Sequence, residues 1–335
     1  MLKGLALTPP VIGRIAIGRV VEKAGRRLPE KDDEFTLTSQ VQNKEGWVPH
    51  SVDAQLRKEP GAKLLSIPVR LLFDDPDLSL RANYTMFDRA TGRPLCVGDG
   101  ESCKRVTLSG MQSLPCPSPA VCPLAQDGNC KPYGRLHVRV EAEGNTEAST
   151  TGDELGSFVF RTTGFNSIRT LSARLRYLFA VSGGLLAGLP LELRLRGKST
   201  TLSQRTPIYY VDLTLRGGST LAQVVALARQ ERDQQTALGL DQAALDEAAR
   251  QGLALGEFEE SEEEGVEVVE EFYPEPGMEG EHAGDRESDG ESSGSQRVQA
   301  PSPSISLRGK LHRKQEALGV RATATGDPGV SHAGT

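Results

Sequence analysis

The chain has 335 residues, enough for one large domain or two ordinary ones. Its apolar fraction is 37%, it holds 36 glycines and 20 prolines, and its last quarter has few large aliphatic residues, so the folded part should end early. No apolar run approaches the roughly 18 residues that cross a bilayer, and no segment has the form of a secretory signal. The composition therefore predicts a cytoplasmic protein with no membrane span.

The net charge of −6 conceals segments of opposite sign. Residues 257–291 hold sixteen acidic residues against Arg286, residues 292–335 carry six basic and two acidic residues, and residues 1–256 are net basic. We therefore expect a basic folded part and a tail over 256–335 that is disordered, first acidic and then basic.

The N-terminal third predicts short strands separated by turns. Residues 13–18 and 35–38 alternate between apolar and polar side chains, which is typical of half-buried strands. Residues 64–73 are aliphatic and end in the turn formers of 74–77, and residues 82–87 predict a fourth strand. The sheet resumes, after a long insertion, with strands over 135–140 and 155–162.

A helix is predicted from Ile168, capped by Asn166 or Ser167 and ended by Gly183. Two further strands, 189–195 and 209–215, are predicted to pair as a hairpin. Ser219 is expected to cap a second helix that runs to about residue 236, and Asp241 to start a shorter one.

Together these elements predict an α+β fold that is mainly β. We expect an antiparallel sheet domain over 1–218 that contains a zinc-binding loop region at 96–134, followed by one or two packed helices over 219–255. The loop region has little periodicity and many turn formers, as a segment wrapped around a metal ion has.

The cysteines are Cys96, Cys103, Cys116, Cys122 and Cys130, all within one short stretch. A reducing compartment disfavours a disulfide framework, and zinc takes four thiolate or imidazole ligands from tight turns, so we expect a structural zinc ion. Four thiolates would close the site to water. Buried, reduced cysteines are the alternative, and the spacing alone leaves open whether Cys96 or Cys103 completes the set.

Residues 155–216 carry nine basic residues against Glu192 and Asp212. This surface could bind nucleic-acid phosphates or an acidic protein surface, and an ordinary solvated surface is the alternative. The acidic tail could cover it in the free protein. The candidate binding residues are Arg169, Arg174, Arg176, Arg194, Arg196 and Lys198.

Catalytic patterns are scarce. The chain has no His-Glu-x-x-His zinc motif, no phosphate-binding loop and no nucleophile elbow, so we do not expect an enzyme, and the sequence identifies no small-molecule substrate. His137 falls in a predicted strand and is expected to be a packed side chain.

Several stretches, in this order, resemble one known family over roughly residues 12–216. They are Gly13-Arg-Ile-Ala-Ile-Gly18, Leu28-Pro29, Phe35-Thr-Leu-Thr-Ser39, residues 93–100, Pro115-Cys116-Pro117, Cys122-Pro123, Cys130-Lys-Pro-Tyr-Gly-Arg-Leu136 and Phe160-Arg-Thr-Thr-Gly-Phe-Asn-Ser-Ile-Arg169. The pattern is similar to that of the recombination directionality factor-like proteins of phages and integrated elements, which are related to the factor that acts with phage serine integrases.

The resemblance implies an accessory protein that binds an integrase on its DNA and shifts recombination from integration toward excision, with no active site of its own. It also implies Cys96, Cys116, Cys122 and Cys130 as the metal ligands, with Cys103 spare. Two other functions remain open: a zinc-containing nucleic-acid-binding protein of mobile-element replication, recombination or repair, and a metal-dependent hydrolase.

Overall fold

The computed structural model describes residues 10–23, 26–44, 46–59, 61–141, 156–199, 201, 205, 207–255, 268–269 and 272–273. All of these belong to one compact unit, Met1–Gly284, and the second unit, Asp285–Thr335, lies outside the described residues. Most of the tail predicted to be disordered therefore also lies outside them.

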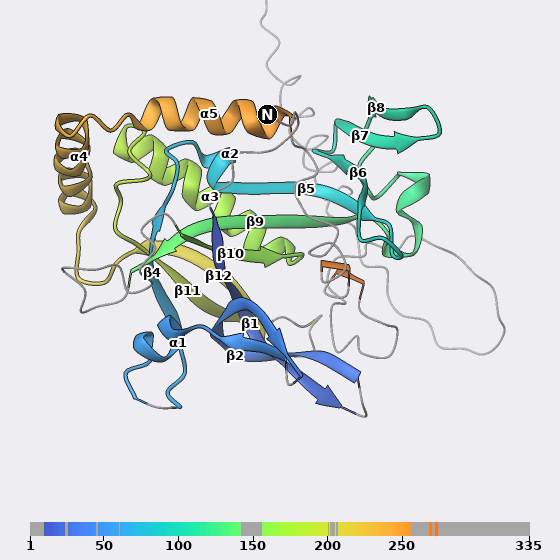
Figure 1. Ribbon diagram of the computed structural model, residues 1–335, viewed down its shortest axis with the longest axis horizontal. Helices are drawn as coiled ribbons and strands as arrows, with labels where there is room; N and C mark the ends of the chain where they lie inside the picture. Colours follow the sequence, from blue (N-terminus) through green and yellow to red (C-terminus); the bar gives the residue numbers. More distant parts are fainter. Residues whose placement is uncertain are drawn as a thin grey trace, which may run out of the picture. The chain divides into compact units, whose positions relative to one another are not determined.

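The described residues form an α+β fold dominated by its strands (Figure 1). The strands are β1 (Val11–Lys23), β2 (Arg26–Asn43), β3 (Gly46–Pro49), β4 (Ser66–Leu71), β5 (Leu80–Phe87), β6 (Pro94–Gly98), β7 (Ser102–Thr107), β8 (Gly110–Pro115), β9 (Lys131–Val140), β10 (Ser157–Thr162), β11 (Leu191–Lys198) and β12 (Ile208–Leu215). The helices are α1 (Ser51–Leu56), α2 (Pro76–Ser79), α3 (Phe165–Ser182), α4 (Leu221–Ala237), α5 (Gln242–Leu255) and the 3-10 turn η1 (Pro123–Gly128). None of these helices is long and apolar enough to cross a membrane.

The sheet is mixed, which corrects the prediction of an antiparallel one. Its main path runs β3-β2-β1-β10-β9-β5-β6-β7-β8, and β4, β11 and β12 branch from β9. Every described strand pair is antiparallel except β1 and β10, which are parallel. Parallel neighbours need a long crossover, and here the chain forms β2 to β9 before β10 returns to β1, a pairing that local sequence pattern does not encode.

Strand β9 is the point at which the sheet divides. On one edge it pairs with β10, and its other edge is shared by β5, opposite Lys131–Leu136, and β4, opposite Val138–Val140. Figure 1 shows β5 and β9 running toward β6, β7 and β8 at one end, with β4 and α4 toward the other. The division creates two arms, a cysteine arm (β5 to β8) and a hairpin arm (β4, β11 and β12).

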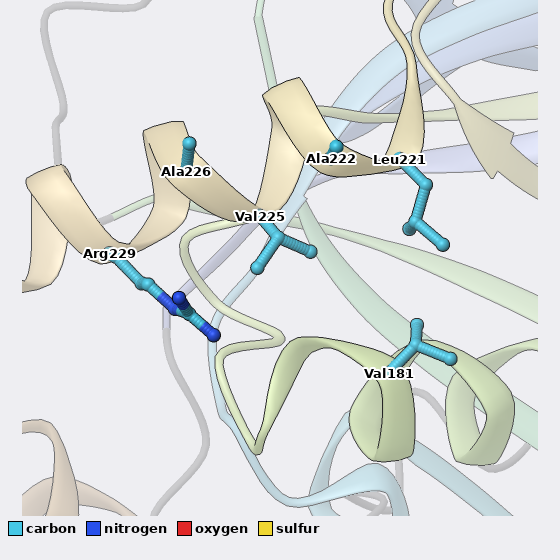
Figure 2. A pocket seen from close by; sticks show the side chains of 6 residues that line it. All are labelled: Val181, Leu221, Ala222, Val225, Ala226 and Arg229. Carbon is cyan, nitrogen blue, oxygen red and sulfur yellow. The ribbon is translucent and has the colours of Figure 1, made fainter.

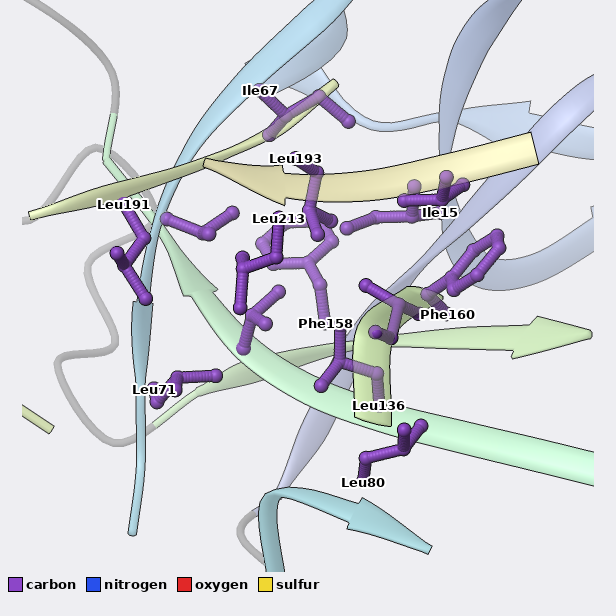
Figure 3. Close-up of a cluster of buried hydrophobic side chains, with 14 of the residues drawn as sticks. Ile15, Ile67, Leu71, Leu80, Leu136, Phe158, Phe160, Leu191, Leu193 and Leu213 are labelled. Carbon is purple, nitrogen blue, oxygen red and sulfur yellow. The ribbon is translucent and has the colours of Figure 1, made fainter. Parts of the chain in front are cut away.

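Two cross-strand rows of apolar side chains form the centre of the core (Figure 3). Leu136 of β9 lies opposite Leu80 of β5 and Phe160 of β10. The second row joins β4, β9 and β10 through Leu71, Val138 and Phe158. All six side chains are buried, and each contributes about 1.5–3 kcal/mol by leaving water.

Helix α3 begins at Phe165 after Gly164, not at Ile168 after a capping Asn166 or Ser167. Both polar side chains serve tertiary contacts instead. The Ser167 hydroxyl accepts the backbone N–H of Val211 at 3.1 Å, and the Asn166 side-chain oxygen accepts a hydrogen bond from Lys198 at 2.7 Å. Ser167 thereby caps an N–H on the edge of β12, which has β11 as its strand neighbour among the described residues.

Helix α4 is capped by Thr220 rather than the predicted Ser219. The Thr220 hydroxyl accepts the N–H of Gln223 at 3.3 Å, while the Gln223 side chain accepts the N–H of Thr220 at 2.9 Å. This reciprocal pair satisfies two donors of the first turn. The predicted start of the next helix at Asp241 is confirmed, since Asp241 accepts the N–H of Ala244 at 3.0 Å.

Helices α4 and α5 are fastened to the loop that follows β4. Asp246 of α5 is buried, and its carboxylate accepts the backbone N–H groups of Asp74 at 3.0 Å and Asp75 at 3.2 Å. Asp74 in turn pairs with Arg232 of α4 and accepts the N–H of Ala187 at 2.9 Å. The aspartates of 74–77 thus serve packing and capping.

Residues 96–134, predicted as an irregular loop, contain the meander β6-β7-β8 and η1. The turn between β6 and β7 is set by Asp99, whose carboxylate accepts the N–H groups of Glu101 at 2.8 Å and Ser102 at 2.7 Å. Most side chains of β8 are exposed, so neither face imposes an alternating apolar pattern and periodicity could not reveal the strand.

Four described residues of the stretch predicted to be disordered are packed. Val268 and Phe272 are buried against Phe87 of β5 and Tyr133 of β9, and Val269 and Tyr273 flank them. For these four the prediction is wrong, because the strongly acidic composition around them hid a short apolar motif.

His137 is buried on the face of β9 opposite to Leu136 and Val138. Burial, together with the positive charges of Arg81, Arg135 and Arg161, lowers its pKa to about 3. The expectation of a packed histidine is confirmed, and the imidazole is neutral in the folded protein.

This burial predicts a measurable loss of stability in mild acid. Unfolded histidine binds a proton near pH 6.5 whereas folded His137 does not, so falling pH favours the unfolded state. Between pH 7 and pH 5 the wild type should lose about 2 kcal/mol more unfolding free energy than His137→Leu. Urea unfolding of both proteins at the two pH values measures the difference, and parallel pH dependence would contradict it.

Candidate metal centre and basic surface

The five cysteines occupy the cysteine arm and the turns beside it. Cys96 on β6 and Cys103 on β7 are buried, and Cys116 after β8, Cys122 before η1 and Cys130 before β9 are half-buried. None of the five is in a disulfide. Figure 1 shows the meander β6-β7-β8, which carries two of these cysteines, at the end of β5 and the start of β9.

Local backbone geometry sets these positions. A side chain at Gly98 would meet Cys103 Cβ and the Ser102 carbonyl at 2.7 Å, so glycine permits the close approach of β6 and β7. Ser118 has a left-handed backbone with φ of 67°, and its carbonyl accepts the N–H of Cys122 at 3.0 Å. This turn brings the chain back toward the meander between Cys116 and Cys122.

The thiols interact with one another. Burial, together with the nearby Cys96, Cys116 and Cys122, raises the pKa of Cys130 to about 12. These are the four cysteines that the family resemblance implies as ligands. Burial likewise raises the pKa of Cys103 to about 11, with contributions from Cys96 and Cys116.

Arg105 on β7 is the cation of this cluster. A hydrogen bond to Cys96 raises the pKa of its guanidinium, and the guanidinium also donates to Cys103 Sγ at 3.9 Å. Sequence reasoning missed Arg105. The cross-strand position of Arg105 opposite Cys96 could have revealed it only if the meander had been recognised.

The donor chemistry of this cluster fits zinc, which favours thiolate ligands. Within the described residues, however, no three side chains of the types His, Cys, Asp or Glu converge closely enough to hold a metal ion. The structure therefore gathers the predicted ligands in one region without forming a coordination sphere.

The basic surface is built around Asp212, a buried carboxylate on β12. Its two oxygens accept hydrogen bonds from Arg174 of α3 at 2.9 Å and from Arg196 of β11 at 3.4 Å. The interaction with Asp212 raises the pKa of Arg174. The structure thus brings two of the candidate residues together from separate elements, and each keeps more than 40% of its side chain exposed.

The other four candidates have different partners or remain exposed. Arg194 pairs with Glu192 on the same strand, and Lys198 bonds to Asn166 at the start of α3. Arg176 of α3 is exposed and lies 3.9 Å from Asp77, and Arg169 is exposed on the same helix. Sequence reasoning treated Asp212 and Glu192 only as offsetting charges, although strand alternation places both on the face of Arg194 and Arg196.

A shallow groove lies between the end of α3 and α4 (Figure 2). It has a volume of about 530 Å³, and five of its six lining residues are apolar. The lining is Val181, Leu221, Ala222, Val225, Ala226 and Arg229. These side chains include no nucleophile and no group suited to acid–base chemistry near neutral pH.

Comparison with known proteins identifies the family. The model of the Gp3-like family, described as recombination directionality factor-like, matches residues 12–216. No curated protein and no solved structure matches the chain. The matched span begins in β1, ends just after β12 and contains both the cysteine cluster and the basic surface. The chain therefore belongs to the Gp3-like, recombination directionality factor-like family.

Proposed function

We propose that this protein is an accessory factor of a phage or integrated element that binds a recombinase on its DNA and biases site-specific recombination toward excision. Membership of the recombination directionality factor-like family supports this role. In this role the protein acts in the cytoplasm. It works through contacts with the recombinase and its DNA, and it has no active site of its own.

The observation that carries the proposal is the basic surface on α3, β11 and β12. All six of its candidate residues lie within the family match. Hydrogen bonds to the buried Asp212 orient the guanidinium groups of Arg174 and Arg196, so these groups are positioned before a partner binds. Pre-positioned guanidinium groups lose little conformational freedom on binding, and they suit the carboxylates of a recombinase or the phosphates of its DNA.

We further propose that Cys96, Cys116, Cys122 and Cys130 hold a structural zinc ion, with Cys103 as a spare thiol. Zinc would tie the meander and η1 to the start of β9. The family resemblance implies this set, and all four cysteines lie within the family match. Four thiolates would leave zinc no open position for water, so its role would be structural.

The zinc proposal predicts different outcomes for two serine variants. Wild type and Cys103→Ser should each contain one zinc per chain by elemental analysis, whereas Cys116→Ser should contain none. Cys116→Ser should also melt at least roughly 5 °C lower, since each kcal/mol is worth about 2–4 °C in a domain of this size. A zinc-free wild type that unfolds cooperatively would show the proposal to be wrong.

The basic surface predicts a loss of partner binding on charge reversal. Arg169→Glu combined with Arg176→Glu should weaken binding to the recombinase–DNA complex by at least about tenfold, because two exposed cations become anions. Arg174 is unsuitable for this test, since its loss would leave the buried Asp212 poorly paired. Gel-shift titration and an excision assay with the element's own recombinase measure the effect.

The matched control is Lys58→Glu combined with Arg229→Glu, which makes the same change in net charge at exposed positions elsewhere. It should bind and support excision like the wild type. Equal losses in both double variants would point to non-specific electrostatics. If the Arg169 and Arg176 changes abolish salt-sensitive binding to DNA alone, the protein is a direct DNA binder, and its recombinase contact lies elsewhere.

A further inference from the structure

Four described residues of the acidic stretch pack beside the cysteine arm. Phe272 is 1% exposed, and its ring meets Phe87 and Tyr133 edge to face with centroids 4.9 Å and 6.0 Å away. Val268 is equally buried in the same cluster. We call residues 268–273 the docked segment, of which Val268, Val269, Phe272 and Tyr273 are described.

Polar contacts fix the docked segment as closely as apolar ones. The Tyr273 hydroxyl donates to the Asn129 carbonyl at 2.5 Å, accepts the N–H of Phe87 at 3.1 Å and lies 3.4 Å from the Phe87 carbonyl. Lys131 Nζ donates to the Phe272 carbonyl at 3.0 Å, and the Arg89 guanidinium lies 4.4 Å from the centre of the Tyr273 ring.

The sheet explains why a peptide is held here. Strand β9 begins at Lys131, which pairs with Thr85, so the Phe87 peptide lies beyond the last pair of β5 and β9. The Tyr273 hydroxyl makes hydrogen bonds with the backbone groups of Phe87, with which β9 does not pair. A tyrosine hydroxyl that both donates and accepts is suited to such a strand end.

Charge favours an acidic ligand. Arg89 and Lys131 line the site, and Arg135 lies 5.4 Å from the Tyr133 ring. The docked segment reads Val-Val-Glu-Glu-Phe-Tyr and belongs to the stretch 257–291 with its sixteen acidic residues. The ligand thus combines negative charge with two adjacent aromatic residues.

Connectivity makes the ligand exchangeable. Helix α5 ends at Leu255, and residues 256–267 join it to the docked segment. The docked segment's contacts with the site are non-covalent, and it competes for the site as part of the same chain. A peptide of the same chemistry from another molecule can make the same contacts.

We propose that Phe87, Arg89, Asn129, Lys131 and Tyr133 form a docking site for an acidic peptide with adjacent Phe and Tyr residues. The docked segment is its intramolecular ligand in the free protein, and a partner segment of the same chemistry displaces it. Because Asn129 and Lys131 flank Cys130, exchange at the site reaches the cysteine cluster directly. The proposal is independent of any recombinase.

The test uses the full chain and a fluorescein-labelled peptide with the sequence of residues 264–277. In fluorescence anisotropy, Phe272→Ala combined with Tyr273→Ala should bind the peptide saturably, because the site is vacated. Wild type should bind it at least tenfold more weakly, because the docked segment competes. A peptide carrying the same two alanines should not bind the vacated protein.

Two further variants make the test decisive. Phe165→Ala combined with Tyr177→Ala removes the same residue types from exposed positions on α3 and should bind the peptide as weakly as wild type. Tyr273→Phe keeps the apolar packing and removes only the hydroxyl bonds, so it should show an intermediate gain even if the double alanine variant unfolds. Absence of peptide binding to Tyr273→Phe, or equal binding to it and wild type, overturns the proposal. Neither DNA nor recombinase is present, so the result leaves the excision role untouched.

Discussion

The fold depends on β9 sharing one of its edges between two strands. Lys131–Leu136 pair with β5 and Val138–Val140 with β4, so the sheet must diverge where one partner ends and the other begins. The two rows of apolar side chains, centred on Leu136 and Val138, fix this register, because a slip by one residue would expose both. One arm then carries the cysteines and the other the hairpin with its arginines, so both candidate sites are positioned by one strand.

Charge on the hairpin arm is organised by burial. A carboxylate that is nearly inaccessible, such as Asp212, is costly unless it is paired, and two guanidinium groups from different elements supply the pairing. The arrangement orients cations outward, although it neutralises part of their charge. The net charge of a stretch of sequence therefore overstates the electrostatic potential of the surface. It also does not reveal which cations are held in place, because tertiary contacts determine that.

The sequence predicted the elements that have one buried face. The hairpin expected at 189–195 and 209–215 is formed by β11 and β12, because Leu191, Leu193, Val211 and Leu213 mark its core side. Three features escaped prediction for physical reasons. The meander β6-β7-β8 is too exposed to alternate, the β1–β10 pairing joins residues more than a hundred positions apart, and Ser167 serves a neighbouring strand rather than its own helix. The cysteine positions predicted a cluster, whereas the role of Arg105 required the strand register.

Helices α4 and α5 lie beyond the family match, yet they are tied to it at one loop. Asp246 of α5 accepts the N–H of Asp74, in the loop after β4. The Asp74 carboxylate in turn pairs with Arg232 of α4 and accepts the N–H of Ala187, which follows α3. Phe272, which belongs to the acidic stretch that follows α5, is instead buried against Phe87 and Tyr133. The described residues on either side of 256–267 are therefore fixed at different parts of the sheet, α5 at the loop after β4 and Phe272 beside β5 and β9.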